Sequence, residues 1–363
     1  MKVEHFIPFF RRSSGITPVI LSSLQSVKHR DIEVNLNASY IEEGIHDFEV
    51  NQTLKETYLA RVYGISKSVI PSCTNETRVI HVHGLWSFVN LVMLLFQRRV
   101  KNDFVIISVH GMLSSAALRK SRILKRLFWI LIQRKQLNKA NLIHVTSLEE
   151  GHQLIAKGVY TPYVLIPLGL SHIPLYEEQT NSEPPIVFGF LGRIVPIKRL
   201  EILVEAFKKV NETENVELWI AGPINDKEYF KVLGLEFIKG VKYFGELHGQ
   251  NKTSFYKGID CFVLPSSSEN FGMVVLEAMS YQNLVIASKG TPWELLQEYG
   301  IGWFGFDDSY ELVSLMKLFL HEDPKKIMDM RRRAYDIVSK EYSIQNFESA
   351  LYKAYKNGLT TLK

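Results

Sequence analysis

The sequence predicts an α/β protein with two doubly wound domains, and three observations support this fold class. Its 363 residues are enough for two domains of about 150–180 residues each. Apolar runs typical of buried parallel strands recur along both halves, with helical patterns between them. A polar stretch at 171–185, which contains three prolines, is typical of a linker. We therefore expect a first domain at 1–170 and a second domain from residue 186.

Composition and charge favour a soluble protein in a reducing compartment. The 46% hydrophobic and 22% charged residues are ordinary for a globular protein, and the net charge of +5 is mild. Only Cys73 and Cys261 are present, so we expect no disulfide. Neither a signal peptide nor a membrane-spanning run of about 20 apolar residues is visible. We expect a cytoplasmic protein without a nucleic-acid partner, at most bound to the inner face of the plasma membrane.

The first expected strand, Val3–Phe10, leads into a turn at Gly15 and a helix from about Thr17. A strand, a glycine turn and a helix start can together hold a phosphate, because the first backbone N–H groups of a helix are free. A plain turn is an equally good interpretation of this single glycine.

Two further expected strands, Val79–Gly84 and Phe104–Gly111, both end in His-Gly. Ligands gather at the carboxyl ends of strands in open α/β sheets, which makes His110 a candidate site residue. His81 and His83 share one strand face, so a metal pair is conceivable. Because no third ligand lies nearby in the sequence, we favour a structural role for His81 and expect no metal.

The stretch 119–139 interleaves eight basic residues with apolar ones and holds no acidic residue. A basic amphipathic helix can rest on an anionic membrane or meet an anionic lipid-linked acceptor. The alternative is a packed helix with a solvated basic side. Since the stretch is more apolar than a surface helix needs, we expect much of it to lie in the core. The last strands of the first domain follow at 141–147 and 163–169.

The second domain opens with a strand at Ile186–Arg193. Pro196 favours a helix start, and we expect a helix from Lys198. Arg193 and Lys198 are five residues apart across the intervening loop and can both point at one anion. The alternative is a pair of surface cations. Leu203, Ala206 and Phe207 should form the inner face of this helix. Further strands are expected at 216–221, 241–244, 261–264 and 283–288, and helices from residue 308 onward.

The stretch Pro265–Met279 organises the second half of the chain. It follows an expected buried strand and passes through a polar loop into a helix that begins at Gly272. At about 1.5 Å rise per residue, Gly272 and Glu277 lie roughly 7–8 Å apart, and Glu269 adds a few more. Two carboxylates on either side of a helix N-terminus suit a ligand with hydroxyls at both ends and phosphate in the middle, as in a nucleotide-sugar. The alternative is an ordinary strand, loop and helix with solvated glutamates.

This stretch, with Pro265-Ser266, Glu269, Phe271-Gly272 and Leu276-Glu277-Ala278-Met279, resembles the Glu-x7-Glu signature of the retaining glycosyltransferases of family 4. The resemblance implies the GT-B fold, in which two Rossmann-like domains face each other across a deep cleft. It also implies that the donor-binding domain ends near residue 341 and that a C-terminal helix at 342–363 packs back on the first domain. The similar members build bacterial surface polysaccharide and lipopolysaccharide.

The resemblance assigns roles to individual residues. Arg193 and Lys198 would grip the donor diphosphate, and Glu277 would hold the ribose hydroxyls. His110 and Glu269 would act as the catalytic residues that orient the donor sugar. The implied donor-binding set is Gly15, Arg193, Lys198, Glu269, Phe271, Gly272, Met273, Val274 and Glu277.

The implied reaction transfers a hexose from a nucleoside-diphosphate sugar to the hydroxyl of a glycan or lipid-linked acceptor, with retained anomeric configuration. Because the chain has no Asp-x-Asp, we expect no metal cofactor. Two alternatives stay open: a nucleotide-sugar epimerase on the same fold, and a non-catalytic subunit that binds nucleotide-sugar. A glycoside hydrolase that uses Glu269 and Glu277 is disfavoured, because such an enzyme has no use for a basic diphosphate site.

Overall fold

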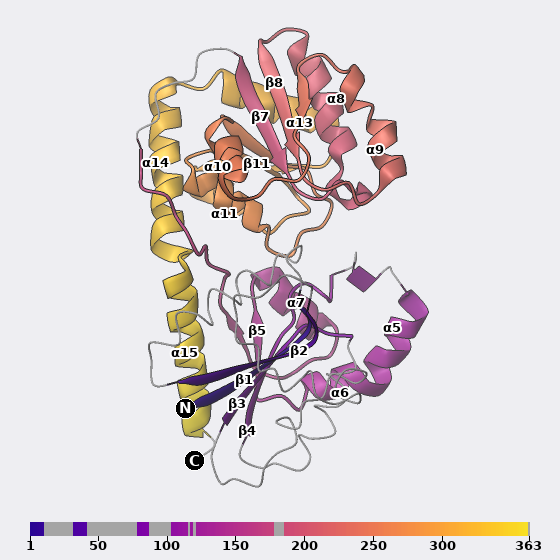
Figure 1. The fold of residues 1–363 in the computed structure, drawn as a ribbon, viewed down its shortest axis with the longest axis vertical. Coiled ribbons are helices and arrows are strands. Elements are labelled where there is room, and N and C mark those ends of the chain that lie inside the picture. The colour runs from indigo at the N-terminus through magenta and orange to yellow at the C-terminus, as the bar shows by residue number, and fades with distance from the viewer. Residues whose placement is uncertain are drawn as a thin grey trace. The chain divides into compact units, whose positions relative to one another are not determined.

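The computed structural model describes residues 1–10, 32–41, 78–86, 103–114, 117–118, 121–177 and 185–361. It divides into two compact units (Figure 1). Unit 1 consists of Met1–Ser171 together with Ile344–Lys363, and unit 2 consists of His172–Ser343. Each unit contains one six-stranded parallel sheet with helices, which confirms the predicted α/β class with two doubly wound domains.

The sheet of unit 1 has the order β2-β1-β3-β4-β5-β6. Its neighbouring strands are all parallel. The strands are β1 (Lys2–Phe10), β2 (Glu33–Ile41), β3 (Arg78–His83), β4 (Asp103–Ser108), β5 (Leu142–Val145) and β6 (Tyr163–Leu165). The described helices are α5 (Arg122–Phe128), a π-helical turn η3 (Trp129–Gln133), α6 (Arg134–Leu137), α7 (Leu148–Ala156) and α15 (Ile344–Thr361).

The two faces of this sheet differ in chemistry, because successive strand residues point to opposite sides. Ile80 and Val82 of β3 belong to the apolar core on one face. His81 and His83 point to the other face, in register with Ile106 and Ser108 of β4. Helix α15 covers this second face. Its Tyr355 hydroxyl lies 2.5 Å from Nδ1 of His81.

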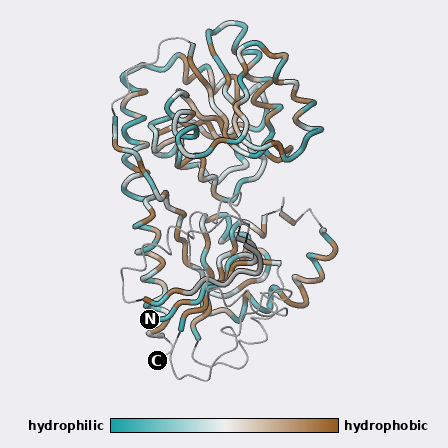
Figure 2. The backbone as a smooth tube through the Cα atoms, in the orientation of Figure 1, coloured by the Kyte–Doolittle hydropathy of each residue, from teal (hydrophilic) through white to brown (hydrophobic). Residues whose placement is uncertain are grey.

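The sheet of unit 2 has the order β12-β11-β10-β7-β8-β9 and is also parallel throughout. Its strands are β7 (Ile186–Leu191), β8 (Val216–Ala221), β9 (Val241–Tyr243), β10 (Cys261–Leu264), β11 (Leu284–Ser288) and β12 (Gly302–Phe306). Its helices are α8 (Leu200–Asn211), α9 (Lys227–Leu233), α10 (Gly249–Lys257), α11 (Met273–Ser280), α12 (Leu295–Glu298), α13 (Ser309–Leu320) and α14 (Pro324–Glu341), with 3₁₀ turns η4 (Pro196–Lys198) and η5 (Leu235–Phe237). The strands run mostly brown through the middle of unit 2 in Figure 2, as expected for a sheet covered on both faces.

The predicted helix from Lys198 begins two residues later. Residues Pro196–Lys198 form a single 3₁₀ turn, and Arg199 takes a left-handed conformation with φ of 49°. Helix α8 then starts at Leu200, and its predicted inner residues are buried: Leu203, Ala206 and Phe207.

The strand order places a topological switch point in each unit. In unit 2 the chain moves from β7 to β8 on one side and later to β10 on the other side. In unit 1, β2 and β3 flank β1 in the same way. Ligands of doubly wound sheets bind beside such points, at the carboxyl ends of the strands. The loops after β7 and β10 are therefore the first place to look for a site. In the described part of the chain, no helix is long and apolar enough to cross a bilayer.

Candidate functional site

The loops after β7 and β10 are hydrogen-bonded to each other at the switch point of unit 2. Ser267 N–H donates to the carbonyl of Ile197 over 2.9 Å. The Nε atom of Arg199 donates to the carbonyl of Pro265 over 2.8 Å. The predicted diphosphate loop and the Glu-x7-Glu loop thus form one structure, although about 70 residues separate them in the chain.

Two glycines allow this arrangement. Gly272 is the N-cap of α11 and has a φ of +78°, which side chains disfavour. At Gly290, after β11, a Cβ atom would lie 2.5 Å from the carbonyl oxygens of Ser266 and Ser267. The β10 loop therefore rests directly on the backbone of Gly290, which also accepts a hydrogen bond from Glu269 N–H over 2.9 Å.

Lys198 and Glu269 form an ion pair in these loops, between Nζ and Oε2. Their side chains are only 13% and 19% exposed, so solvent screens the pair less than a surface pair. Ser266 Oγ lies 3.5 Å from the same carboxylate oxygen. When such a pair separates, Lys198 can bind an anionic group of a ligand, and Glu269 can accept a hydrogen bond from a hydroxyl of the same ligand.

Arg193 lies in the same loop and has an exposed side chain. None of the ion pairs within the described residues includes Arg193. Its guanidinium is therefore available to an external anion.

The N-terminus of α11 is the second group suited to an anion. No side chain caps it and its first turn contains no acidic residue. Its first backbone N–H groups therefore carry the positive end of the helix dipole without a neutralising partner. Met273 and Val274 begin the helix and are half-buried. The Phe271 side chain is buried against Trp293, whose Nε1 donates to the Phe271 carbonyl over 2.6 Å. Phe271 thus has a clear structural role in fixing the entry to the helix.

Glu277 is held by two side chains of α10 that sequence reasoning missed. Lys252 Nζ lies 2.7 Å from Oε1, and the Tyr256 hydroxyl donates to Oε2 over 2.7 Å. Burial and the neighbouring Glu277 charge raise the pKa of Tyr256 well above its ordinary value. Lys252 and Tyr256 are four residues apart and share one face of their helix, but nothing in the sequence pairs that face with Glu277.

In unit 1 the predicted site residue His110 follows β4 and has a φ of 51°. A left-handed backbone is uncommon for histidine and has to be held by its surroundings. The next residue, Gly111, donates its N–H to the carboxylate of Glu150, which also accepts from Thr146 N–H over 2.8 Å. Burial lowers the pKa of His110 to about 3, and the ring is neutral at physiological pH. Its Nδ1 is buried and has no hydrogen-bond partner in the described structure.

His81 has the structural role that the sequence favoured. It belongs to a hydrogen-bonded chain that ends on a backbone carbonyl: His144 Nε2 lies 2.8 Å from Ile166 O. A carbonyl only accepts, so His144 Nδ1 must accept from Ser108 over 2.7 Å. Ser108 Oγ therefore accepts from His81 Nε2 over 2.6 Å. His81 Nδ1 is then left to accept from the Tyr355 hydroxyl, which fixes α15 to the sheet.

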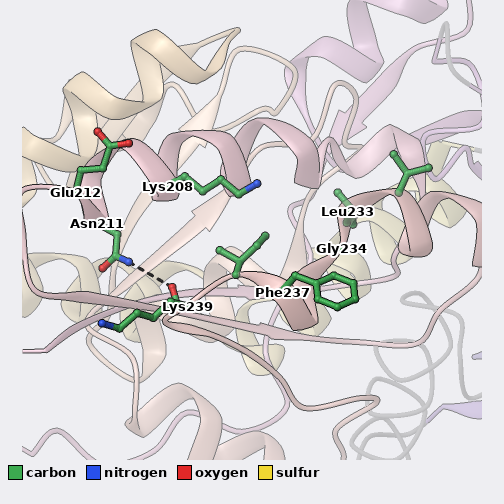
Figure 3. A pocket seen from close by; sticks show the side chains of 9 residues that line it. Lys208, Asn211, Glu212, Leu233, Gly234, Phe237 and Lys239 are labelled. Carbon is green, nitrogen blue, oxygen red and sulfur yellow. Dashed lines mark hydrogen bonds between the residues drawn. The ribbon is translucent and has the colours of Figure 1, made fainter.

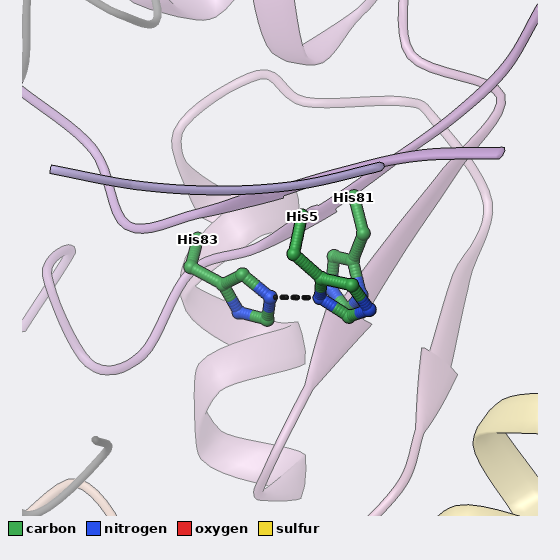
Figure 4. Close-up of side chains that lie close together, drawn as sticks. All are labelled: His5, His81 and His83. Carbon is green, nitrogen blue, oxygen red and sulfur yellow. Dashed lines mark hydrogen bonds between the residues drawn. The ribbon is translucent and has the colours of Figure 1, made fainter. Parts of the chain in front are cut away.

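The sequence showed no third potential metal ligand near His81 and His83, but the structure places His5 of β1 beside them. One ring nitrogen each of His5, His81 and His83 lies within 4.8 Å of the others (Figure 4). A tetrahedral zinc needs such nitrogens free to coordinate. However, both nitrogens of His81 already bond to Tyr355 and Ser108, and His5 Nδ1 faces His83 Nε2 at 2.9 Å. These contacts do not fit a metal, and the absence of a metal cofactor stays a prediction.

A cavity of about 500 Å³ lies elsewhere in unit 2 (Figure 3). Its lining includes Asn211, which precedes β8, and Lys239, which precedes β9. It is therefore at the amino ends of these strands, opposite the loops of the candidate site. The predicted site residues are absent from its lining. Gly15, the remaining predicted residue, lies outside the described residues.

The prediction that much of 119–139 lies in the core is wrong for its first half. Helix α5 has no buried residue. Five large apolar side chains at helical spacing are between 46% and 79% exposed, and we call them the apolar face: Ile123, Leu124, Leu127, Ile130 and Leu131. Trp129 and Leu137 do reach the core of unit 1.

Comparison with known proteins agrees with this arrangement. Residues 174–337, which include both loops of the candidate site, match the family described as Glycosyl transferases group 1. An uncharacterized glycosyltransferase of Methanocaldococcus jannaschii is 28% identical over 300 residues, which cover 80% of this chain and 79% of the relative. The sulfoquinovosyl transferase SQD2 of Arabidopsis thaliana is 32% identical over 151 residues, 39% of this chain and 28% of the relative. A second M. jannaschii glycosyltransferase is 34% identical, but this match also spans only 28% of the relative's length.

Two solved structures share the fold over nearly the whole chain. Anabaena HepE, in complex with UDP and glucose, has a TM-score of 0.72 at 18% identity and covers 98% of this chain and 100% of its own. The sucrose-phosphate synthase of Thermosynechococcus elongatus has a TM-score of 0.75 at 15% identity, with 99% of each chain covered. The solved structures show the GT-B fold for this chain. The match to glycosyl transferases group 1 lies within the second unit and spans most of it.

Proposed function

We propose that the protein is a retaining, metal-independent glycosyltransferase that moves a hexose from a nucleoside-diphosphate sugar to an acceptor hydroxyl. The observation that carries the proposal is the Lys198–Glu269 ion pair. It lies at the switch point of unit 2, between two loops that are bonded to each other. UDP-sugars are the first donors to try, since the HepE structures contain UDP with glucose and UDP-glucose.

In this proposal the donor diphosphate takes the place of Glu269 beside Lys198. Arg193 and the N-terminus of α11 add further positive groups. Together they stabilise the charge that develops on the leaving nucleotide, so the chain's own cations do what a metal does in other transferases. This arrangement supports metal independence, which metal chelation during turnover would test.

Once Lys198 turns to the phosphate, Glu269 is free to accept hydrogen bonds from the donor sugar. Glu277 would bind the ribose hydroxyls through the carboxylate that Lys252 and Tyr256 now hold. His110 would hydrogen-bond the sugar through its unpartnered Nδ1. Retention would follow from attack on the same face of the sugar, with the departing phosphate accepting the proton of the acceptor hydroxyl.

We propose a lipid-linked or glycan acceptor in bacterial surface polysaccharide or lipopolysaccharide assembly, and contact with an anionic membrane through the apolar face. Support comes from its five exposed apolar side chains and the basic residues beside them, Arg122, Lys125 and Arg126. Such a helix buries apolar side chains at the lipid boundary and attracts anionic headgroups. One of the similar proteins is a capsular polysaccharide biosynthesis glycosyltransferase of Staphylococcus aureus, 30% identical over 112 residues.

Co-sedimentation with vesicles tests the membrane contact. A triple variant, Leu124→Ser, Leu127→Ser and Leu131→Ser, should lose binding to vesicles that contain phosphatidylglycerol. The control is Val232→Ser with Phe237→Ser, which removes two still more exposed apolar side chains from unit 2. Equal loss in both variants, or equal binding to zwitterionic vesicles, would contradict the proposal.

Donor binding and transfer test the main proposal. We would titrate UDP, GDP, ADP and their hexose derivatives by calorimetry and follow hexose transfer with chelator present. The variant Lys198→Met should reduce turnover by about a hundredfold or more, as for loss of one group that stabilises transition-state charge. The control Lys209→Met removes a lysine paired with Glu205 on the surface of α8 and should leave turnover unchanged. A folded protein that binds none of these nucleotides would overturn the proposal. Binding without transfer would favour the non-catalytic subunit, and conversion of the free nucleotide-sugar would favour the epimerase.

A further inference from the structure

Three histidines of unit 1 form a hydrogen-bonded file that leads from His110 into the sheet. His110 Nε2 lies 3.1 Å from His83 Nδ1, and His83 Nε2 lies 2.9 Å from His5 Nδ1. The ring planes of His5 and His83 differ by 10°, and those of His83 and His110 by 14°. The three residues come from three different segments: β1, the end of β3 and the turn after β4. Figure 4 shows the contact between His5 and His83.

All three rings are neutral. Burial lowers the pKa of His5 to about 3 and the pKa of His110 to about 3. Burial and the neighbouring histidines lower the pKa of His83 well below its ordinary value. A neutral imidazole has one N–H donor and one bare nitrogen acceptor. Each nitrogen–nitrogen contact therefore needs a donor on one side and an acceptor on the other.

This requirement links the tautomers of the three rings. If His110 carries its proton on Nε2, it donates to His83 Nδ1, so His83 must also carry its proton on Nε2. His83 then donates to His5 Nδ1, and His5 must carry its proton on Nε2 as well. In the opposite arrangement all three carry the proton on Nδ1. Only these two arrangements make both hydrogen bonds, and a mixed arrangement breaks at least one.

One end of the file, His110 Nδ1, is open to a ligand. His110 Nδ1 is buried and has no partner in the described residues. An unpaired buried polar atom is destabilising, and a bound ligand that hydrogen-bonds to it removes this cost. The backbone around His110 is held separately, by the hydrogen bond from Gly111 to Glu150. The ring is therefore fixed both in place and in orientation before any ligand arrives.

We propose that His83 and His5 are positioning residues that fix the tautomer of His110. In this way they decide whether His110 Nδ1 donates a hydrogen bond to a ligand hydroxyl or accepts one. The identity of the ligand as the donor sugar rests on the proposed function, whereas the coupling of the three rings does not. His5 touches no ligand in this proposal, and it acts on His110 only through His83.

Nitrogen NMR of the wild-type protein tests the coupling without substrate. In protein that carries ¹⁵N in the histidine rings, long-range proton–nitrogen spectra distinguish a protonated ring nitrogen from a bare one. His5, His83 and His110 should all show the same tautomer at pH 7.5. His81 and His144 should both show protonated Nε2, because Ile166 O sets their direction, and they serve as an internal reference. Different tautomers among the three file members would overturn the proposal.

Variants extend the test to His83, which contacts His110, and to His5, which acts on it only through His83. Both His83→Phe and His5→Phe should change the His110 spectrum from one tautomer to a mixture. The control Tyr355→Phe breaks the other chain at His81 and should leave the His110 spectrum unchanged. If the Phe variants fail to fold, His83→Leu and His5→Leu, which also remove the ring nitrogens, replace them. A folded His5 variant with an unaltered His110 spectrum would exclude the coupling.

Kinetics then separate this inference from the proposed function. If the protein transfers a hexose, the His5 variant should lower kcat about tenfold with little change in donor KM, because orientation rather than binding is lost. A shared tautomer in a protein without transferase activity would leave the inference standing and remove the proposed function. Transfer with full kcat in both file variants would overturn the positioning role.

Discussion

Apart from the Arg78–Asp103 ion pair at the start of β3 and β4, the sheet of unit 1 is marked by buried neutral histidines. Unit 2 has no buried histidine among its described residues and holds charged pairs instead. Five histidines, His5, His81, His83, His110 and His144, are at most 9% exposed. Unit 2 instead pairs Lys198 with Glu269, Lys252 with Glu277 and Arg331 with Asp260. Its own histidines, His172, His248 and His321, are exposed.

The difference indicates that similar sheets can carry sites of different character. Charged pairs at the switch point of unit 2 can exchange partners with an anionic ligand, because each member keeps its charge. Neutral histidines under α15 cannot bind an anion by charge, but they hold hydrogen bonds in fixed directions. Unit 2 is therefore suited to charge, and unit 1 to orientation.

Acid should destabilise unit 1 far more than unit 2, and this is the largest of the expected effects. Burial lowers the pKa of five histidines of unit 1. The pKa falls to about 3 for His5 and His110, to about 4 for His144, and well below its ordinary value for His81 and His83. Because the unfolded histidines titrate near pH 6.5, the unfolded state binds more protons below that pH. Stability is therefore full above pH 6.5 and lost as the pH falls toward 4. From pH 7.5 to 5 the loss is about 2 kcal/mol per histidine. Glu150 opposes this weakly, since burial raises its pKa.

Hydrogen exchange by mass spectrometry at both pH values would measure each unit by itself. Five such losses exceed the stability of many domains, which is about 5–15 kcal/mol. Amides of β3, β4 and β5 should lose protection by pH 5, while those of β7, β8 and β10 keep it. Equal loss of protection in both units would break the comparison.

The buried ion pair of unit 2 should give the next largest effect. Arg331 lies 3.7 Å from Asp260, and their side chains are 5% and 9% exposed. Arg331→Met leaves a buried carboxylate without its cation and should lower the free energy of unfolding of unit 2 by about 3–5 kcal/mol. Urea denaturation would measure the change. Arg333→Met, on the exposed side of the same helix, should change stability by less than about 1 kcal/mol.

A smaller loss is expected from the hydrogen-bonded chain of unit 1. Tyr355→Phe removes the hydroxyl that donates to His81 but keeps the buried ring. The unpaired nitrogen should cost about 1–3 kcal/mol in the free energy of unfolding. Tyr160→Phe is the control, since this tyrosine is 83% exposed. A Tyr355→Phe protein as stable as wild type would mean that α15 is held by apolar packing alone.

The smallest expected effect concerns nucleotide binding. Glu277→Gln keeps the size of the side chain and removes its charge. We expect the nucleotide Kd to rise about fivefold, or about 1 kcal/mol, as for one weakened hydrogen bond. Calorimetry would measure it, with Glu205→Gln on the surface of α8 as the control. An unchanged Kd would show that Glu277 does not bind the ribose hydroxyls.

The sequence was informative where the chemistry is local. The strand, loop and helix at 261–280 could be predicted because its strand, glycine and glutamates follow one another in the chain. Arg193 and Lys198 could be placed in a loop for the same reason. The partners of these residues could not be predicted, since Lys252, Tyr256 and Gly290 reach them only through the order of the strands.

Unit 1 was harder to predict for a physical reason. His81 alone suggested a satisfied histidine, but the file depends on His5, which is 78 residues away from His83 in the chain. Glu150 reaches Gly111 from the start of α7, and nothing in its local pattern sets it apart. The apolar residues of α5 suggested a buried helix, because composition alone does not say which apolar face meets the core.

The position of Tyr355 in the chain also affects how the protein is made. The strands of unit 1 are synthesised before unit 2, yet the helix that covers their histidine face starts only at Ile344. All of unit 2, His172–Ser343, is synthesised in between. At about 5–20 residues per second this interval lasts roughly 10–30 s. The nascent sheet must therefore wait, with its histidines open to water, until α15 has been synthesised. A chain cut before Tyr355 would leave the histidine face of strands made much earlier without its hydrogen-bond partner.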